Sequence, residues 1–293
     1  MYTVIGATGN TGRVVAEDLL AAGHKVRVVG RSEKRLTGFV EKGAEPAVGD
    51  VSDAEFVAEA CDGIGGVYCM IPPRYDLDLS AWQSKVGKAL AAGIRSAGVP
   101  YIVNLSSIGA QHPAGTGPIL ALREMEGRLN ELTVPNVLHL RPTWFMENFF
   151  MNLEGIRHMG VLAMSLPGDV PMPLIATQDI GAVAARRLAA LDFEGHHVQE
   201  LIGPREYTMQ EAATLIGAAI GQPDLGYQQI SYEETEQGLA SMGIHPGTIA
   251  TFIEMYRGAE AGLLVAEESR SLANTTPTTL EEFAGVLAAV YNA

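Results

Sequence analysis

The sequence predicts an α/β fold in which helices cover both faces of a doubly wound parallel sheet, followed by a smaller helix-rich cap. Short β-branched runs alternate with helical patterns through the first half of the chain, and a glycine-rich turn directly follows the first run. The alternation stops after residue 142, beyond which prolines are frequent and strands few. Repeated strand–helix–strand units specify parallel strands, because each helix returns the chain to the same end of the sheet.

The expected elements follow one another along the first half of the chain. The predicted buried strands are residues 3–5, 25–29, 46–48, 66–70, 101–105 and 137–140. The predicted helices between them are residues 11–22, 33–42, 53–61, 79–97 and 120–132. The third helix is expected to start at the capping box Ser52-Asp53-Ala54-Glu55, in which a hydroxyl and a carboxylate satisfy exposed backbone N–H groups.

We assign residues 1–145 to a nucleotide-binding domain and residues 146–293 to a smaller substrate cap. A helix at 177–191 lies within the second segment and is expected to pack back on the sheet. Capping boxes are expected to start three other helices of the cap, at residues 208–211, 231–234 and 278–281.

Composition and charge exclude several classes of protein. The formal net charge is −14, which argues against nucleic acid and anionic membranes as partners. No apolar run approaches the roughly 18 residues of a membrane span. The first residues form a strand rather than a signal peptide, so we expect a cytoplasmic protein. Cys61 and Cys69 are the only cysteines and lack the spacing of metal ligands, so we expect reduced thiols and no metal.

The turn after the first strand has the composition of a phosphate-binding loop, Gly6-Ala7-Thr8-Gly9-Asn10-Thr11-Gly12. A helix N-terminus presents unpaired N–H groups and a partial positive charge, and glycine lets a pyrophosphate approach the backbone closely. The spacing is GxxGxxG rather than the common GxGxxG of Rossmann folds, but its position after the first strand favours the same role. We therefore expect a dinucleotide to bind at six residues of this turn, namely Gly6, Thr8, Gly9, Asn10, Thr11 and Gly12.

The end of the second strand favours NADP(H) over NAD(H). NAD-binding folds place an acidic residue there, whereas this chain reads Val28-Val29-Gly30-Arg31-Ser32. Residues 25–42 also hold six of the chain's 20 cations against two acids, a local charge of +4 in a protein of −14. We expect Arg31 to bind the 2′-phosphate through its guanidinium, with Lys34 or Arg35 as a second contact.

The end of the third strand, Gly49-Asp50-Val51, supplies a further cofactor candidate. Asp50 could accept a hydrogen bond from the adenine amino group, with Val51 beside it. Asp50 could equally cap the following helix, and the sequence leaves both readings open.

Four motifs together resemble the NmrA-like branch of atypical short-chain dehydrogenase/reductases, over essentially the whole chain. They are Gly6-Ala7-Thr8-Gly9-Asn10-Thr11-Gly12-Arg13, Gly30-Arg31, Gly49-Asp50 and Leu140-Arg141-Pro142-Thr143-Trp144-Phe145-Met146-Glu147-Asn148. Similar proteins include NADPH-dependent quinone reductases, triphenylmethane dye reductases and isoflavone-type reductases. The branch also includes co-regulators that bind NADP without turnover, and tailoring enzymes of aromatic polyketides.

The resemblance implies positions for the cofactor and for catalysis. It places the adenosine or ribose edge beside Met70, Ile71 and Pro72. It places the nicotinamide beside Pro142, Thr143, Trp144 and Phe145. Ser106 and Ser107 then occupy the place of the classical catalytic serine, with Ser106 assigned to the cofactor and Ser107 to catalysis. Ordinary loop capping is the alternative for both serines.

The usual proton donor of the classical enzymes is missing. They use the tyrosine of a Tyr-x-x-x-Lys pair, and none of the nine tyrosines here precedes a lysine by four residues. Many relatives carry a basic residue and a Glu on the fifth helix, where this chain has Glu126, and Arg123 beside the basic position. Either could instead be a surface charge of the helix. We take Glu126, Ser107 and His112 as catalytic candidates, and expect His139, within a strand, to belong to the core.

This absence favours a particular chemistry. Hydride delivery to a ketone needs a positioned acid worth about 10²–10⁴ in rate, whereas a quinone or cationic dye needs little protonation at that moment. We therefore expect an NADPH-dependent reductase of quinones or related planar apolar compounds. A non-catalytic NADP(H)-sensing regulator and an aromatic-polyketide tailoring enzyme remain alternatives. The oligomeric state is open, with a homodimer as one alternative.

The cap supplies aromatic and methionine side chains that suit a planar ligand. They concentrate after the sixth strand, at Trp144, Phe145, Met146, Phe149, Phe150 and Met151, and recur at Met164, Met172, Met255 and Tyr256. Each of them could equally be ordinary core.

Overall fold

The computed structural model describes residues 1–133 and 136–293, and its main feature is a seven-stranded parallel sheet. The strand order is β10-β6-β5-β4-β1-β2-β3. The strands are β1 (Tyr2–Ile5), β2 (Val26–Gly30), β3 (Glu45–Val48), β4 (Gly66–Cys69), β5 (Tyr101–Leu105), β6 (Asn136–Pro142) and β10 (Gly195–Leu201). All neighbouring pairs are parallel, which confirms the predicted doubly wound α/β fold.

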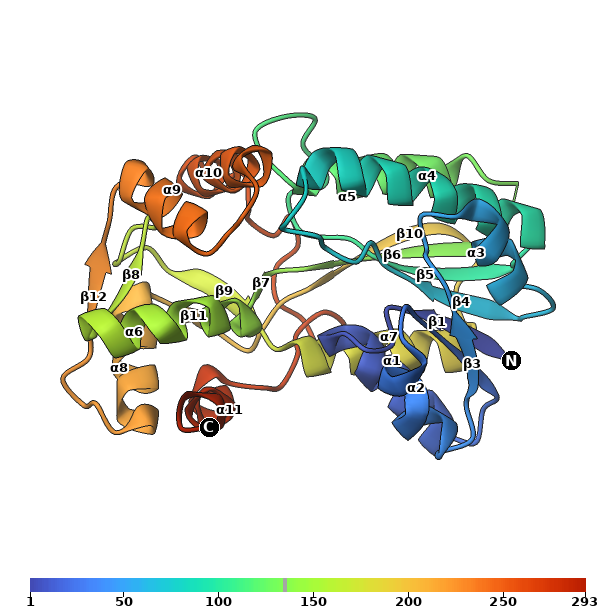
Figure 1. Ribbon diagram of the computed structural model, residues 1–293, viewed down its shortest axis with the longest axis horizontal. Helices are drawn as coiled ribbons and strands as arrows, with labels where there is room; N and C mark the ends of the chain where they lie inside the picture. The colour runs from blue at the N-terminus through green and yellow to red at the C-terminus, as the bar shows by residue number, and fades with distance from the viewer. Residues whose placement is uncertain (134–135) are drawn as a thin grey trace.

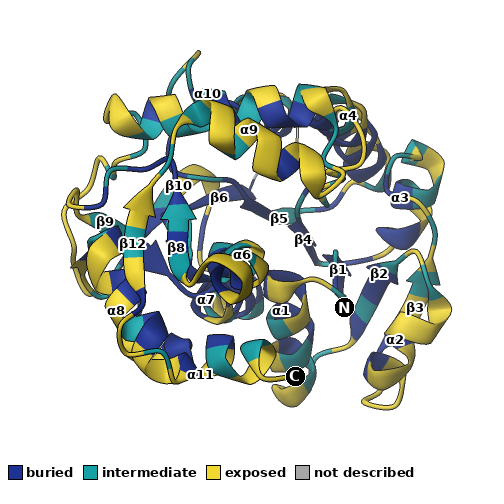
Figure 2. Cartoon of the chain, turned by 60° about the vertical axis from the view of Figure 1, so that its left-hand side comes forward, coloured by how far each residue is buried: buried dark blue, intermediate teal, exposed yellow. Residues whose placement is uncertain are grey.

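Helices cover both faces of the sheet (Figure 1). One face carries α3 (Ala54–Ala60), α4 (Leu79–Ala97) and α5 (Ile119–Asn130). The other carries α1 (Asn10–Ala21), α2 (Glu33–Val40) and α7 (Thr177–Ala190). Figure 2 shows the central strands as buried and the outward faces of the helices as exposed. No helix within the described residues is long and apolar enough to cross a membrane.

The chain order places a crevice at the middle of the sheet. From β1 the chain moves to one side through β2 and β3, and then to the other side through β4, β5 and β6. Loops that leave β1 and β4 therefore diverge at the carboxyl edge, where α/β sheets bind their ligands.

The second half of the chain forms a smaller lobe beside that edge (Figure 1). Its two small sheets have the strand orders β11-β9-β7 and β12-β8. The strands are β7 (Trp144–Phe145), β8 (Val161–Met164), β9 (Met172–Ile175), β11 (Glu206–Tyr207) and β12 (Gly226–Gln229). The helices are η1 (Met146–Asn152), α6 (Leu153–Met159), α8 (Met209–Ile220), α9 (Tyr232–Ser241), α10 (Pro246–Glu260) and α11 (Leu280–Tyr291). A separate apolar core, which includes Phe149 and Tyr207, joins several of these elements.

Two strands of the seven-stranded sheet differ from the sequence prediction. Strand β10 was not expected, and it pairs with β6 although its residues come from the segment assigned to the cap. Its first four residues are exposed, so it lacks the apolar run by which a buried strand is recognised. Strand β3 was expected to be buried, but it is largely exposed at the other edge of the sheet. Pro46 is tolerated there because an edge strand does not need every N–H group for pairing.

Capping patterns in the sequence identified four helices, but they placed the start of two of these helices at the wrong residue. The boxes at 208–211 and 231–234 are present as predicted. The box expected at Ser52 is absent, and α3 begins after Asp53, whose Oδ1 accepts from the Glu55 N–H at 2.9 Å.

The last capping box lies one residue later than predicted, at Thr279 and Glu282 rather than at 278–281. The hydroxyl and N–H groups of Thr278 instead donate to the carboxylate of Asp179 in α7, at 2.8 and 2.9 Å. This contact ties the start of α11 to the helix that packs on the sheet.

Candidate functional site

The glycine turn brings the start of α1 directly over the end of β1. Gly6 has φ +74°, and the Gly9 N–H donates to its carbonyl at 2.9 Å. A Cβ atom on Gly12 would lie 2.3 Å from the Gly6 carbonyl oxygen, and one on Gly6 would lie 2.6 Å from the Sδ atom of Met70. Position 6 therefore requires glycine because of its positive φ and its contact with Met70, and position 12 requires it because of the close approach to the Gly6 carbonyl.

The start of α1 fits a pyrophosphate. Gly9 is the N-cap and has no side chain, so no side chain caps the first N–H groups of the helix. Gly9 and Asn10 are exposed and Thr8 is half-buried. The Thr11 side chain is buried, and its Oγ1 accepts from the Tyr68 hydroxyl at 2.8 Å, so only its backbone N–H can serve a ligand. Free N–H groups, a helix dipole and a cradle without Cβ atoms suit the phosphates of a dinucleotide.

Two of the predicted arginines lie at or near this turn, at the carboxyl edge of the sheet. Arg31 immediately follows β2, where no acidic residue occurs. The Arg35 Nη2 atom donates to the carbonyl oxygen of Thr8 at 3.4 Å, which places its guanidinium against the turn itself. Both positions suit a phosphorylated ribose.

Two other cations of the basic segment form ion pairs within the protein. Arg27 forms an ion pair with Glu45 at 3.2 Å and bonds carbonyl oxygens near the end of α3. Lys42 forms an ion pair with Glu17 at 2.6 Å. These two cations connect neighbouring elements of the fold instead.

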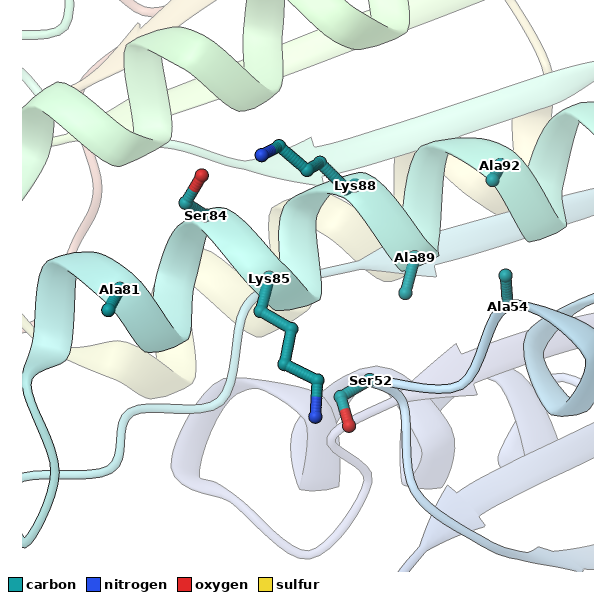
Figure 3. Close-up of a pocket in the computed structure, with 8 residues that line it drawn as sticks. All are labelled: Ser52, Ala54, Ala81, Ser84, Lys85, Lys88, Ala89 and Ala92. Atoms are coloured by element: carbon teal, nitrogen blue, oxygen red, sulfur yellow. The ribbon is translucent and has the colours of Figure 1, made fainter.

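Asp50 does not cap α3, because the N-cap of this helix is Asp53. Its Oδ1 accepts from the Ser52 N–H at 2.9 Å, and this bond, helped by the charges of Lys85 and Arg31, lowers the pKa of Asp50. Figure 3 shows Lys85 of α4 extending toward Ser52, across an open groove of about 580 Å³. Asp50 is thus an ionised acceptor just beyond the carboxyl end of β3, while Val51 next to it is buried.

A cavity of about 270 Å³ lies where the carboxyl edge of the sheet meets the smaller lobe. Its lining is mostly apolar, and no described lining residue carries a charge at neutral pH. The lining residues are Met70, Ile71, Pro73, Tyr75, Leu79, Gln83, Leu105, Ser106, Ser107, Ile108, Pro118, Ile119, Leu122, Thr143, Trp144, Phe145, Asn148, Met172, Pro173, Phe252, Met255 and Leu264.

The cavity gathers many of the residues predicted from the sequence. Those on its lining are Met70, Ile71, Ser106, Ser107, Thr143, Trp144, Phe145, Met172 and Met255. Pro72, Pro142 and His112 are not on it. The Pro72 carbonyl instead accepts from the Trp82 indole N–H at 2.7 Å, and Pro142 is buried within β6.

Several lining residues had no signal in the sequence. Tyr75 lies in the loop after β4, Gln83 on α4, and Phe252 on α10. Phe252 is far from the other two in the chain, so only the fold brings it to the same cavity. Conversely, Met146 and Phe149 of the aromatic run are fully buried in the core of the smaller lobe.

Glu126 lies beneath the cavity in a buried ion pair. Its carboxylate accepts from Arg141 Nε at 2.9 Å and Nη2 at 2.6 Å, and from the Ser106 hydroxyl at 2.5 Å. Burial would raise the pKa of Glu126, but the bonds from Arg141 and Ser106 outweigh it and leave this pKa lowered. Glu126 is therefore not a surface charge, and it reaches the cavity only through Ser106.

Arg123, the neighbouring candidate, is turned away from Glu126. Its Nη1 atom donates to the carbonyl oxygens of Ala110 and Gln111, at 3.1 and 3.0 Å. It thereby fixes the loop after β5. His112 lies in the same loop, outside the lining of the cavity.

His139 belongs to the core, as predicted. Its Nδ1 and Nε2 atoms are bonded to the side chains of Asn104 and Asn130, at 3.1 and 3.0 Å. Burial lowers the pKa of His139 to about 4, although the charge of Glu126 acts in the opposite direction. The imidazole is thus neutral at pH 7 and forms a buried polar cluster with Asn104 and Asn130, close to the charge of Glu126.

Comparison with known proteins identifies the family that the motifs resemble. The sequence profile of the NmrA-like family matches residues 2–284. The (4-alkanoyl-5-oxo-2,5-dihydrofuran-3-yl)methyl phosphate reductase of Streptomyces griseus is 30% identical over 284 residues, which cover 96% of this chain and 92% of that protein.

Solved structures share the whole fold. The NADPH-dependent quinone oxidoreductase of Escherichia coli, solved with NADPH, superposes with a TM-score of 0.81 at 23% identity and covers 98% of this chain and 99% of its own. The Citrobacter sp. triphenylmethane reductase, solved with NADP(H), gives a TM-score of 0.77 at 20% identity, over 98% of this chain and 100% of its own.

The close contact in the glycine turn predicts that Gly12→Ala disturbs nucleotide binding. The added Cβ must push α1 away from Gly6, which should weaken NADPH binding by at least about tenfold and cost about 1–3 kcal/mol of stability. Gly127→Ala is the control, because nothing lies within 4 Å of its Cβ position in α5. Calorimetric titration should show wild-type affinity in the control only. Wild-type affinity in the Gly12 variant would contradict this account of the turn.

The buried imidazole predicts a loss of stability in mild acid. Between the unfolded pKa of about 6.5 and the folded value of about 4, the unfolded chain binds the proton and the folded chain does not. The contribution of the neutral His139 to the free energy of unfolding is therefore nearly complete at pH 7.5. It falls by about 2 kcal/mol between pH 7.5 and pH 5. His139→Gln should remove this part of the decrease in urea unfolding. His158→Gln, at an exposed position, should keep it, and equal slopes in both variants would refute the assignment.

Proposed function

The chain belongs to the NmrA-like family, and from that premise we propose that it is an NADP(H)-dependent reductase of quinones or related planar aromatic compounds. The observation that carries the proposal is a neutral, largely apolar cavity that adjoins the phosphate turn. Met70 connects the two, because it packs against Gly6 and also lines the cavity. The relatives named above support a reductase.

The cofactor would lie across the carboxyl edge of the sheet. Gly9, Asn10 and the N–H groups of α1 would hold the pyrophosphate, and Arg31 and Arg35 would hold the 2′-phosphate. Asp50 remains a candidate acceptor for the adenine amino group. When bound, NADPH supplies a hydride, which requires its nicotinamide to face the cavity.

The cavity itself would position a flat substrate and exclude water. Trp144, Phe145 and Met172 offer aromatic and thioether surfaces for a planar ring. Burial raises the pKa of Tyr75, so its phenol remains neutral at pH 7 and can donate a hydrogen bond to a substrate oxygen. The described lining contains no acid–base pair, which favours acceptors that need little protonation during hydride transfer.

The relative from Streptomyces griseus is named for a phosphate ester. The likeness supports a reductase, whereas the cavity of this chain does not favour a phosphate ester as the substrate. A bound phosphate calls for cations or a helix N-terminus. None of the described residues on the cavity lining is a cation.

An assay of NADPH oxidation tests the proposal. We expect turnover with 1,4-naphthoquinone and a triphenylmethane dye, and a kcat/KM at least about 100-fold lower with cyclohexanone or acetophenone, because those ketones need a positioned acid. Absence of turnover with the quinone and the dye, despite measurable NADPH binding, would instead favour the NADP(H)-sensing alternative.

The position of Arg31 predicts how the enzyme selects its nucleotide. Arg31→Ala should raise KM for NADPH about tenfold or more and leave KM for NADH nearly unchanged, because only NADPH carries the 2′-phosphate. Arg95→Ala provides the control. Arg95 is exposed near the C-terminal end of α4, which lies at the amino ends of the strands and therefore away from the glycine turn. Equal effects on both nucleotides would show that Arg31 does not contact this phosphate.

A further inference from the structure

We propose that Arg74, in the loop after β4, is a further cofactor-binding residue. Its guanidinium would bind the 2′-phosphate of NADP(H) together with Arg31, and would exchange its present partner, Asp76, for that phosphate. The inference rests on the proposed NADP(H)-dependent function and adds a residue to its cofactor site. It follows from the course of one loop and from an ion pair within that loop.

Arg74 lies in a loop that runs from the glycine turn past the cavity. The loop starts at Met70, which packs against Gly6, and two of its later residues, Pro73 and Tyr75, line the cavity. A cofactor that joins the turn to the cavity must therefore pass close to this loop.

The backbone of the loop is fixed on both sides of Arg74. The Pro72 carbonyl accepts from the Trp82 indole N–H at 2.7 Å, and the Tyr75 carbonyl accepts from the backbone N–H of His245 at 2.8 Å. The guanidinium of Arg74 lies over the Trp82 ring, 5.5 Å from its centre. Arg74 can therefore change its partner by moving its side chain alone, which limits the entropy lost on binding.

The present partner of Arg74 is an internal carboxylate. Both oxygens of Asp76 accept from the guanidinium, Oδ1 from Nε at 2.7 Å and Oδ2 from Nη2 at 2.6 Å. Arginine binds phosphate through the same two-pronged geometry. The two side chains are 30% and 60% exposed, and an ion pair so exposed is weak because water screens it. A phosphate, which carries more negative charge than a carboxylate, can therefore displace Asp76.

The charges around this ion pair indicate which phosphate it serves. The hydrogen bonds from Arg74 lower the pKa of Asp76 to about 2, and the charge of Arg31 acts in the same direction. The hydrogen bonds to Asp76 raise the pKa of Arg74, and the charge of Asp50 adds to this effect. The Asp76 carboxylate is thus an anion within reach of both Arg74 and Arg31, the residue expected at the 2′-phosphate. This favours the 2′-phosphate over the pyrophosphate, which would lie at the start of α1.

Binding of NADPH and NADH, measured by calorimetry without a substrate, tests the inference independently of turnover. The two nucleotides differ only in the 2′-phosphate. Arg74→Gln should weaken NADPH binding about tenfold and change NADH binding less than about twofold. Asp76→Asn should instead tighten NADPH binding about threefold, because it removes the competing anion. A purely structural ion pair would not give opposite changes, since either substitution breaks the same pair.

Arg74→Lys separates direct contact from attraction at a distance. This substitution keeps the charge but removes the planar fork, so NADPH should still bind about threefold or more weakly than to the wild type. Urea unfolding of each variant is compared in parallel, so that a loss of affinity through misfolding is recognised.

Arg187→Gln is the matched control. Arg187 also forms an ion pair with an aspartate, Asp192 at 2.9 Å, and its guanidinium lies 5.7 Å from the centre of the Phe193 ring. It is located near the C-terminal end of α7, however, at the amino ends of the strands. Its substitution should leave both nucleotide affinities unchanged.

Four outcomes would overturn the inference. They are unchanged NADPH binding in Arg74→Gln, an equal loss for both nucleotides in that variant, full NADPH affinity in Arg74→Lys, and weaker NADPH binding in Asp76→Asn. A wild-type protein that binds neither nucleotide would overturn the proposed function as well. Turnover of 1,4-naphthoquinone is measured separately, and its absence would count against the proposed reductase but not against the contact of Arg74 with the 2′-phosphate.

Discussion

The contact between Gly6 and Gly12 governs the arrangement of the whole site. It brings the N-terminus of α1 over the end of β1 so closely that a single added carbon atom would meet the backbone. The same residue, Gly6, packs against Met70, whose side chain forms part of the cavity wall. The glycine turn and the cavity therefore share one side chain, and a substitution at Gly6 that displaced Met70 would also change the shape of the cavity.

The buried ion pair under the cavity is better explained by positioning than by stability. Burying Glu126 and Arg141 costs desolvation energy that their attraction only partly recovers, and apolar residues of similar volume often serve a fold equally well. What apolar residues could not do is fix the orientation of the Ser106 hydroxyl. The ion pair thereby decides that a polar atom at the end of β5 acts as an acceptor toward the cavity, which gives Glu126 a role although it does not line the cavity.

The sequence was sufficient for features that depend on local pattern. The strand–helix alternation from β1 to α5, the glycine turn and the absence of an acid at Arg31 all lie within short segments, and the structure contains the predicted elements. Features that depend on tertiary partners were missed. Strand β10 is polar because it lies at an edge, and Thr278 cannot start a capping box because Asp179, 99 residues away in the sequence, binds it. Gln83 joins the cavity only through the packing of α4 beside α5.

The candidate contacts for the nucleotide phosphates and adenosine and the walls of the cavity come largely from different parts of the chain. The candidate nucleotide contacts at the turn, at Arg31 and at Asp50 all lie within the first 50 residues. The cavity adds walls from α4, α5 and β7, and from Phe252, Met255 and Leu264 in the last part of the chain. Substitutions in these late residues can reshape the cavity while the phosphate turn stays intact. Such a division allows one fold to serve reductases of chemically different substrates, because only the cavity walls need to differ.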